Sequence, residues 1–288
     1  VCQNAGEGVF LEITEDLPPQ TLADCAKDFF TTKDIVKIGH DVKRDIHTVA
    51  PFGVEEIHAS FDTALAAYLL NPTGNSYEYD DLARDFLEEV YPSAEEVLGK
   101  GRSKQPLESL PEGERVAFAA RQAEVAFRSK QIMAEKIKEN EQEELFYEVE
   151  MPLLYVLADM ERWGMKVDRQ ALLAYQKQLG ESIETITKEI YELSGEEFNL
   201  NSPKQLGVIL FEKMGLKGGK KTKTGYSTAA DVLEKLKNEA PIVEKILYYR
   251  QLAKLKSTYA DGLLAVMDEK TDKIYSTFNQ TITATGRI

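Results

Sequence analysis

The sequence predicts an α/β domain followed by a mainly α-helical region. Up to about residue 143, short apolar segments typical of strands alternate with helical segments, which is the arrangement of a layered α/β domain. From about residue 144, apolar residues recur at helical spacing through long segments. The final segment, 274–288, alternates in polarity and predicts a strand.

Composition and length indicate an ordinary globular protein. The 288 residues suffice for roughly two domains, and 43% are apolar and 29% charged. No apolar run is long enough to span a membrane, and the start resembles no secretion signal. Cys2 and Cys25 form no disulfide framework, and His40, His47 and His58 lack metal-ligand spacing. We therefore expect a cytoplasmic protein without a resident metal.

Charge is distributed unevenly along the chain. The net charge is −14, which alone argues against nucleic acid. Residues 199–288, however, hold 15 Lys and Arg against 9 Asp and Glu, whereas residues 1–198 hold 20 against 40. A basic part on an acidic body is typical of a polyanion site on the basic part.

Local signals place the elements of the α/β part. Gly39 ends one strand, Asp62 or Thr63 caps a helix, and Asn71-Pro72 ends that helix. Gly99 to Pro111 is a loop rich in Gly, Ser and Pro. The expected elements, in order, are a strand at 9–13, a helix at 22–30, a strand at 35–38, a helix from about 41, a helix from 62 or 63, and a helix at 112–139.

Capping residues divide the helical part in the same way. One helix is expected at 148–164, and Asp168 caps a second that runs to Leu193 with apolar residues close to a 3.5-residue period. This long stripe needs an antiparallel partner, for which the helix around 250–263 is the candidate. Ser202-Pro203 begins a further helix, and Ser227 or Thr228 begins another. The basic loop 217–225 lacks P-loop spacing, so we exclude a nucleotide site there.

The helix at 248–263 carries two different faces. At about 100° per residue, one stripe is apolar and faces the core, and the opposite stripe offers a guanidinium, an ammonium and a hydroxyl at one-turn spacing. Such a row suits phosphates, although a solvated helix face is the alternative interpretation. The apolar stripe is Tyr248, Leu252, Leu255, Tyr259 and Leu263, and the polar stripe is Arg250, Lys254 and Ser257.

Two segments of the first part resemble a known domain. Ile38-Gly39-His40-Asp41-Val42-Lys43-Arg44-Asp45 and Phe61-Asp62-Thr63 are similar to the 3′–5′ exonuclease domain of the bacterial DNA polymerase I family. The resemblance implies a ribonuclease-H-like fold, in which four acidic residues hold two metal ions. Asp45 matches the second motif, but the third motif aligns with Phe118 and Gln122, and no match to the first precedes Val9. We therefore expect an inactive, metal-free exonuclease domain kept as a scaffold.

The second part resembles the polymerase domain of family A DNA polymerases. Glu161 to Asp168 is similar to the entry of the family's polymerase domain. The segments similar to the family's thumb are Asn199 to Leu206, the loop 221–225, Ser227-Thr228 and Arg250 to Tyr259. Phe278 to Arg287 matches the segment where thumb meets palm. The resemblance implies that these residues contact primer–template DNA: Arg250, Lys254, Ser257, Thr258, Asn201, Ser202, Lys221, Lys223, Ser227, Asn279, Gln280 and Arg287.

These resemblances lead to one interpretation of the chain. Residues 1–143 are the degenerate exonuclease-like domain, and 144–288 the start of a polymerase domain, with thumb 168–265 and first palm strands 266–288. We expect a monomeric fragment of a bacterial, nucleoid-associated DNA polymerase I. The nucleotidyl-transfer site, its Mg²⁺ and its deoxynucleoside triphosphates belong to the intact parent. The alternatives are an active 3′–5′ exonuclease and a helical interaction module that does not bind DNA.

Overall fold

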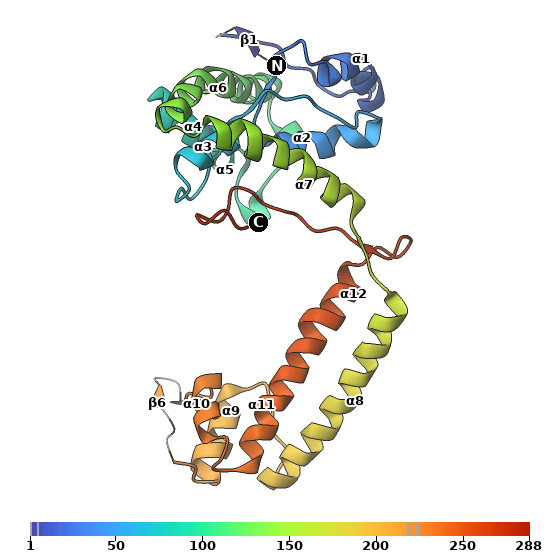
Figure 1. Cartoon of the computed structure of the whole chain (residues 1–288), viewed down its shortest axis with the longest axis vertical. Coiled ribbons are helices and arrows are strands. Elements are labelled where there is room, and N and C mark those ends of the chain that lie inside the picture. Colours follow the sequence, from blue (N-terminus) through green and yellow to red (C-terminus); the bar gives the residue numbers. More distant parts are fainter. Residues whose placement is uncertain (1, 5, 218, 220, 223–224) are drawn as a thin grey trace. The chain divides into compact units, whose positions relative to one another are not determined.

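The chain forms two compact units. The computed structural model describes residues 2–4, 6–217, 219, 221–222 and 225–288, without the side chains of 221 and 222. Unit 1 comprises Val1–Trp163 together with Ser276–Ile288, and unit 2 comprises Gly164–Tyr275 (Figure 1). The predicted order of an α/β part followed by a helical part is confirmed. Within the described residues, no helix has the length and apolar character of a membrane span.

A short parallel strand pair lies at the centre of unit 1. β3 (Ile38–Gly39) pairs in parallel with β4 (Phe61–Asp62). Each strand leads into a helix, α2 (Val42–Val49) after β3 and α3 (Thr63–Leu70) after β4. The strand predicted at 35–38 is therefore shorter and displaced, whereas the cap predicted at Asp62 is confirmed, because its carboxylate accepts the amide hydrogens of Ala64 and Leu65.

The strand predicted at 9–13 is absent from this described segment. Instead, β1 (Cys2–Asn4) forms an antiparallel pair with β2 (Glu7–Gly8). Val9, Leu11 and Ile13 are each more than half exposed. Among the residues that the structure describes, no strand pairs with this segment, so its alternating pattern does not suffice for a strand. An ion pair of 2.7 Å between Glu12 and Arg115 connects the segment to α6.

Helices enclose the core of unit 1. The long helix α6 (Glu112–Glu139) has the predicted bounds and packs against α3 and α4 (Tyr79–Leu87). The other elements of this part are α1 (Pro19–Thr31), η1 (Ala50–Phe52), α5 (Ala94–Leu98), η2 (Gly101–Ser103) and η3 (Leu107–Ser109). The fully buried side chains of the core include Phe61, Leu82, Met133, Ile137, Phe146 and Leu154.

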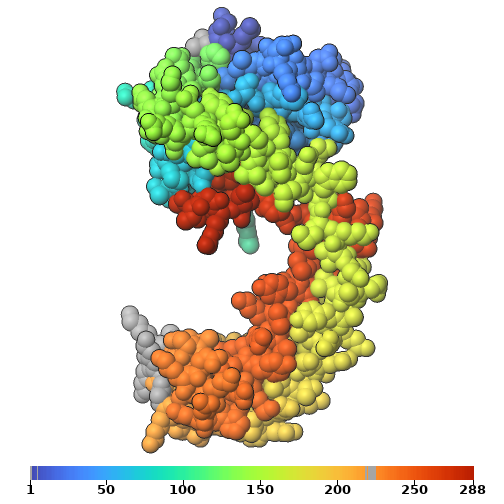
Figure 2. Space-filling view, in the orientation of Figure 1, coloured from blue at the N-terminus to red at the C-terminus, as the bar shows by residue number. Residues whose placement is uncertain are grey.

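Unit 1 ends in a helix and receives the last segment of the chain. A π-helical stretch, η4 (Leu145–Glu150), continues into α7 (Met151–Trp163). Figure 2 shows the dark-red residues 276–288 against the rest of this unit. The strand predicted at 274–288 is wrong beyond β8 (Lys273–Ile274), because the backbone groups of Phe278 and Thr283 bond to side chains of unit 1 and not to a strand.

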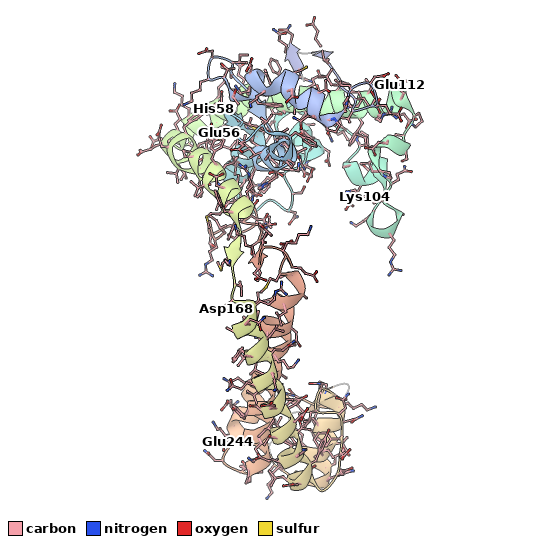
Figure 3. The ribbon with its side chains drawn as sticks, turned by 90° about the vertical axis from the view of Figure 1, so that its right-hand side faces the viewer. Glu56, His58, Lys104, Glu112, Asp168 and Glu244 are labelled. Carbon is pink, nitrogen blue, oxygen red and sulfur yellow. The ribbon has the colours of Figure 1, made fainter. Side chains whose placement is uncertain are left out.

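Unit 2 is built on two long helical arms. α8 (Arg169–Ser194) lies beside α11 (Pro241–Lys254), as predicted (Figure 1). The second arm continues through a π-helical stretch, η6 (Leu255–Asp261), into α12 (Gly262–Val266). β5 (Met165–Lys166) and β8 join the bases of the arms as an antiparallel pair. Asp168 caps α8 as predicted, and Figure 3 shows it at the opposite end of the arms from Glu244.

Shorter elements form the tip of unit 2. Ser202 caps α9 (Pro203–Gly207) as predicted, because its hydroxyl accepts the amide hydrogen of Gln205. The cap predicted at Ser227 or Thr228 is wrong, since α10 (Ala230–Leu236) begins after Ala229 without a side-chain cap. The remaining elements are η5 (Val208–Lys213), β6 (Lys221–Thr222) and β7 (Gly225–Tyr226). Fully buried residues here include Ile190, Leu206, Leu210, Leu233, Ile242 and Ile246.

The apolar stripe predicted on the second arm is only partly correct. Leu252 is buried, but Tyr248 and Tyr259 are each 50% exposed and Leu263 is also exposed. The tertiary partner α8 selects a neighbouring stripe, and the π-helical stretch changes the angular advance assumed for a regular helix. The residues that face the core are Ile242, Val243, Ile246, Tyr249, Leu252 and Ala260.

The compact units and the predicted domains are different divisions of the chain. The units separate after Trp163 and after Tyr275. The predicted boundary after residue 143 lies inside unit 1, and the predicted palm start at 266 lies inside unit 2. The division into 1–143, thumb 168–265 and palm start 266–288 stays a prediction about domain families, which packing alone does not test.

Candidate nucleic-acid interface

Arg250 occupies a fixed position between the second arm and the tip of unit 2. Its guanidinium donates to the backbone oxygen of Thr228 and, at 3.1 Å, to the hydroxyl of that residue. Thr228 is buried and Arg250 half-buried, and burial lowers the pKa of the arginine. Since a guanidinium has five donors, the hydrogen atoms that Thr228 does not take remain for a second acceptor such as a phosphate.

One helical turn further along the arm, Lys254 is exposed. Within the described part of the chain, no carboxylate lies within ion-pair distance of its ammonium group. Lys256 differs, because its ammonium group is bound by Asp261 at 2.9 and 3.0 Å. Ser257 and Thr258 are exposed next to these lysines. Lys254 is therefore an uncompensated charge, and Lys256 is a neutralised one.

The predicted contacts at the tip are polar groups with roles in the fold. Asn201 is exposed, and its side-chain oxygen accepts from the Tyr249 hydroxyl at 3.3 Å. The hydroxyl of Ser202 caps α9, and that of Ser227 accepts the amide hydrogen of Ala229 at 3.4 Å. Each hydroxyl keeps its own hydrogen for donation. Lys223 lies outside the described residues, as does the side chain of Lys221, so both stay predictions.

The predicted contacts near the end of the chain belong to unit 1. Asn279 and Arg287 are exposed. Gln280 is 8% exposed, and its amide group donates to the backbone oxygen and the carboxylate of Glu150 at 3.1 and 2.9 Å. A DNA contact by Gln280 stays a prediction that requires these two hydrogen bonds to break. Sequence reasoning missed these internal partners, because acceptors more than a hundred residues away leave no local signal.

Two of the three predicted exonuclease positions, Asp45 and Gln122, line one cavity in unit 1. A space of about 720 Å³ is lined by Asp45, Gln122, His40 and Tyr79, with apolar walls from α1, β3 and α6. Phe118 does not line this space but contributes with Gln122 to a neighbouring small pocket. Asp45 and Gln122 thus line one cavity, and their correspondence to exonuclease motifs stays a prediction.

Burial shifts the pKa values of Asp45 and His40, two titratable side chains in this cavity. Burial raises the pKa of Asp45 to about 7, with Arg44 opposing and Asp62 adding to the shift. Burial also lowers the pKa of His40 to about 3, and its ring bonds to the Thr63 hydroxyl at 2.9 Å. Asp62 is unavailable as a ligand, because both its oxygens accept backbone amide hydrogens.

This set of donors does not fit a two-metal centre. Such a centre needs several carboxylates that stay ionised next to two cations. Among the residues that the structure describes, no three His, Cys, Asp or Glu side chains are grouped so that they could hold a metal ion. At the cavity itself, Asp45 is easily protonated and Gln122 carries no charge.

Asp45→Asn should stabilise unit 1 in a pH-dependent manner. An acid whose pKa is raised in the folded state binds more protons folded than unfolded, so stability falls as the pH rises from about 4 to about 7. The amide removes this loss, and we expect a gain of about 1–3 kcal/mol at about pH 8 and almost none at about pH 4. Urea unfolding of both proteins at the two pH values measures the difference. An equal gain at both would contradict the assignment.

Comparison with known proteins connects both units to DNA polymerases. Residues 4–128 match the family described as DNA polymerase I, ribonuclease H-like domain, and residues 169–288 match DNA polymerase family A. DNA polymerase I of Bacillus subtilis is 44% identical over 250 residues, which cover 86% of this chain and 28% of that protein. DNA polymerase I of a Synechocystis strain is 36% identical over 98% of this chain and 28% of its own length.

A solved structure supports the same relationship. The polymerase domain of Pol1 from M. smegmatis, in complex with DNA primer–template and dNTP, has a TM-score of 0.77 and 31% identity over 94% of this chain and 44% of that one. A ribonuclease-H-like domain followed by a polymerase-domain portion places the chain in the class of DNA polymerases. Within that class, residues 169–288 belong to DNA polymerase family A, and residues 4–128 to the ribonuclease-H-like domain family of DNA polymerase I. The chain spans about 28% of the length of the curated relatives named above.

Proposed function

We propose that this chain grips the sugar–phosphate backbone of a primer–template duplex. The observation that carries the proposal is the uncompensated ammonium group of Lys254, which lies next to exposed Ser257 and Thr258 and one turn from the guanidinium of Arg250. Such groups position a duplex without reading its sequence. The solved relative bound to primer–template and dNTP supports a DNA partner.

The proposal extends to the whole protein from which such a chain would come. There, the grip would hold DNA while a primer is extended from deoxynucleoside triphosphates with two Mg²⁺ ions, as DNA polymerase I relatives do. The nucleotidyl-transfer site would lie in residues other than 1–288. Asn201, Ser202, Ser227, Asn279 and Arg287 would add contacts, together with Lys221 and Lys223.

Salt-dependent duplex binding tests the proposed function. A fluorescent primer–template hairpin is titrated with the chain at about 50 mM and about 200 mM salt, and the logarithm of the binding constant should fall linearly with the logarithm of salt concentration. Since cation release scales with phosphate contacts, a slope of about −2 to −4 is expected for this partial grip. Binding that is absent, or that does not respond to salt, would instead favour a helical interaction module.

We also propose that the exonuclease site is inactive. A labelled single strand incubated with the chain and Mg²⁺ or Mn²⁺ should keep its 3′ end, because the cavity offers one easily protonated carboxylate and a neutral amide where two ions need several charges. An active exonuclease is the competing function. Processive 3′ trimming that disappears in Asp45→Ala would establish it and overturn this part of the proposal.

A further inference from the structure

The last segment of the chain is held by hydrogen bonds to the rest of unit 1. Residues 276–288 contain no helix or strand. They are fixed at three places along their length. Glu161 and Lys43 bind the backbone of Phe278, Glu150 binds the buried side chain of Gln280, and the hydroxyl of Tyr68 donates to the oxygen of Thr283 at 2.8 Å.

Glu161 is the centre of the first and most charged of these anchors. One carboxylate oxygen accepts from the Lys43 ammonium group at 2.5 Å and from the Phe278 amide at 2.6 Å. The other oxygen contacts Nε2 of His47 at 2.5 Å. Lys43 also donates to the backbone oxygen of Phe278, so both the amide hydrogen and the carbonyl oxygen of this residue are bound. We call Glu161, Lys43 and His47 the anchor triad.

The anchor triad is buried enough for its geometry to matter. The side chains of Glu161 and Lys43 are 9% and 13% exposed. Burial acts to raise the pKa of Glu161, but the donors from Lys43, Phe278 and His47 outweigh it and the pKa is lowered. Removing one member of a buried, hydrogen-bonded charge pair leaves the other uncompensated, which is far more disruptive than losing an exposed pair.

The segment that the triad holds carries three predicted DNA contacts, of which Asn279 and Arg287 are exposed and Gln280 is buried. Asn279 follows Phe278 directly, and Arg287 lies beyond Thr283, whose hydroxyl donates to the Arg287 backbone oxygen at 2.6 Å. Contacts from an irregular segment are stronger when its conformation is fixed beforehand, because the entropy of ordering it would otherwise oppose binding.

We propose that Glu161, which Lys43 and His47 hold in place, is a positioning residue that keeps 276–288 in the conformation that presents Asn279 and Arg287 to DNA. This inference rests on the proposed function. It gives the ribonuclease-H-like unit, which supplies Lys43 and His47 from α2, a role that needs no metal and no nuclease chemistry.

The test combines amide exchange with a double-mutant cycle. Glu161→Gln keeps the shape of the side chain and removes its charge. In this variant, amide protection at 278–283 should fall about 10-fold, while that of the α6 core stays unchanged. Glu161→Gln should lower duplex affinity about 5- to 10-fold. In the Arg287→Ala background the same change should lower it less than about 2-fold, because the effects of two coupled residues, Glu161 and Arg287, are not additive. Lys43→Met is the second variant and should behave in the same way.

Controls separate this proposal from the proposed function. Glu95→Gln, which breaks the exposed ion pair of Glu95 with Lys100, should change neither exchange nor affinity. Unchanged exchange at 278–283 in both triad variants overturns the anchor. Positioning is overturned if Glu161→Gln lowers duplex affinity as much in the Arg287→Ala background as in the parent chain. It is also overturned if Glu161→Gln loosens the segment without lowering duplex affinity. A chain that binds no duplex overturns the proposed function and positioning with it, although the exchange data still decide whether the anchor exists.

Discussion

A single charge reversal, Lys254→Glu, should lower the affinity of the chain for a primer–template duplex by about 10- to 100-fold. The lysine is exposed and has no carboxylate partner within the described residues, so its charge is free to meet a phosphate. The reversal removes a charge-assisted hydrogen bond, worth about 1.5–3 kcal/mol, and adds repulsion. Fluorescence anisotropy at about 50 mM salt measures the loss, and the salt slope should become shallower by about 1.

Lys256 provides the matched control for this prediction. It lies two residues away, but Asp261 binds its ammonium group with both oxygens. Lys256→Ala should therefore change duplex affinity by less than about 2-fold, because an already neutralised charge releases few counterions. Neither variant should change stability much, since Lys254 is exposed and a partly exposed ion pair such as Lys256–Asp261 contributes little. Equal losses in the two variants would show that the chain responds to net charge and not to a contact at Lys254.

Sequence reasoning predicted those parts of the fold that local chemistry controls. Asp62, Asp168 and Ser202 cap the helices that they were expected to cap, because a short polar side chain before an apolar helix satisfies free amide groups. The bounds of α6 were also predicted. By contrast, the strands at 9–13 and 274–288 are wrong, since a strand forms only with a neighbour, and an alternating pattern does not reveal whether one exists.

For the candidate site too, the sequence predicted some features and did not reveal others. The resemblance identified the arm with Arg250 and Lys254, but it could not distinguish Lys254 from Lys256. That difference depends on Asp261, which the π-helical stretch brings near Lys256. Glu161 was matched only as part of a family segment. Its role depends on Lys43 and Phe278, which lie more than a hundred residues away on either side.

The other large effect concerns the stability of unit 1. Asp62→Ala should lower its free energy of unfolding by about 3–5 kcal/mol, out of a total of about 5–15 kcal/mol for a typical domain. The Asp62 side chain is buried and caps α3 through Ala64 and Leu65, at 2.8 and 3.1 Å. It also accepts the first amide hydrogen of α2, from Val42 at 2.7 Å, and that of Asp41 at 3.3 Å. Alanine would leave all four amide groups without this acceptor.

The large expected loss of stability in Asp62→Ala follows from the position of this carboxylate between two helices. An ordinary cap contributes about 1 kcal/mol, because water replaces it when it is lost. Asp62 is buried between two helices that follow neighbouring parallel strands, so water cannot replace it without opening the core. Asp168→Ala, which removes an exposed cap with one hydrogen bond in unit 2, is the control and should cost about 1 kcal/mol. Hydrogen exchange reports both units in one sample, and comparable losses from the two variants would contradict the proposed importance of burial.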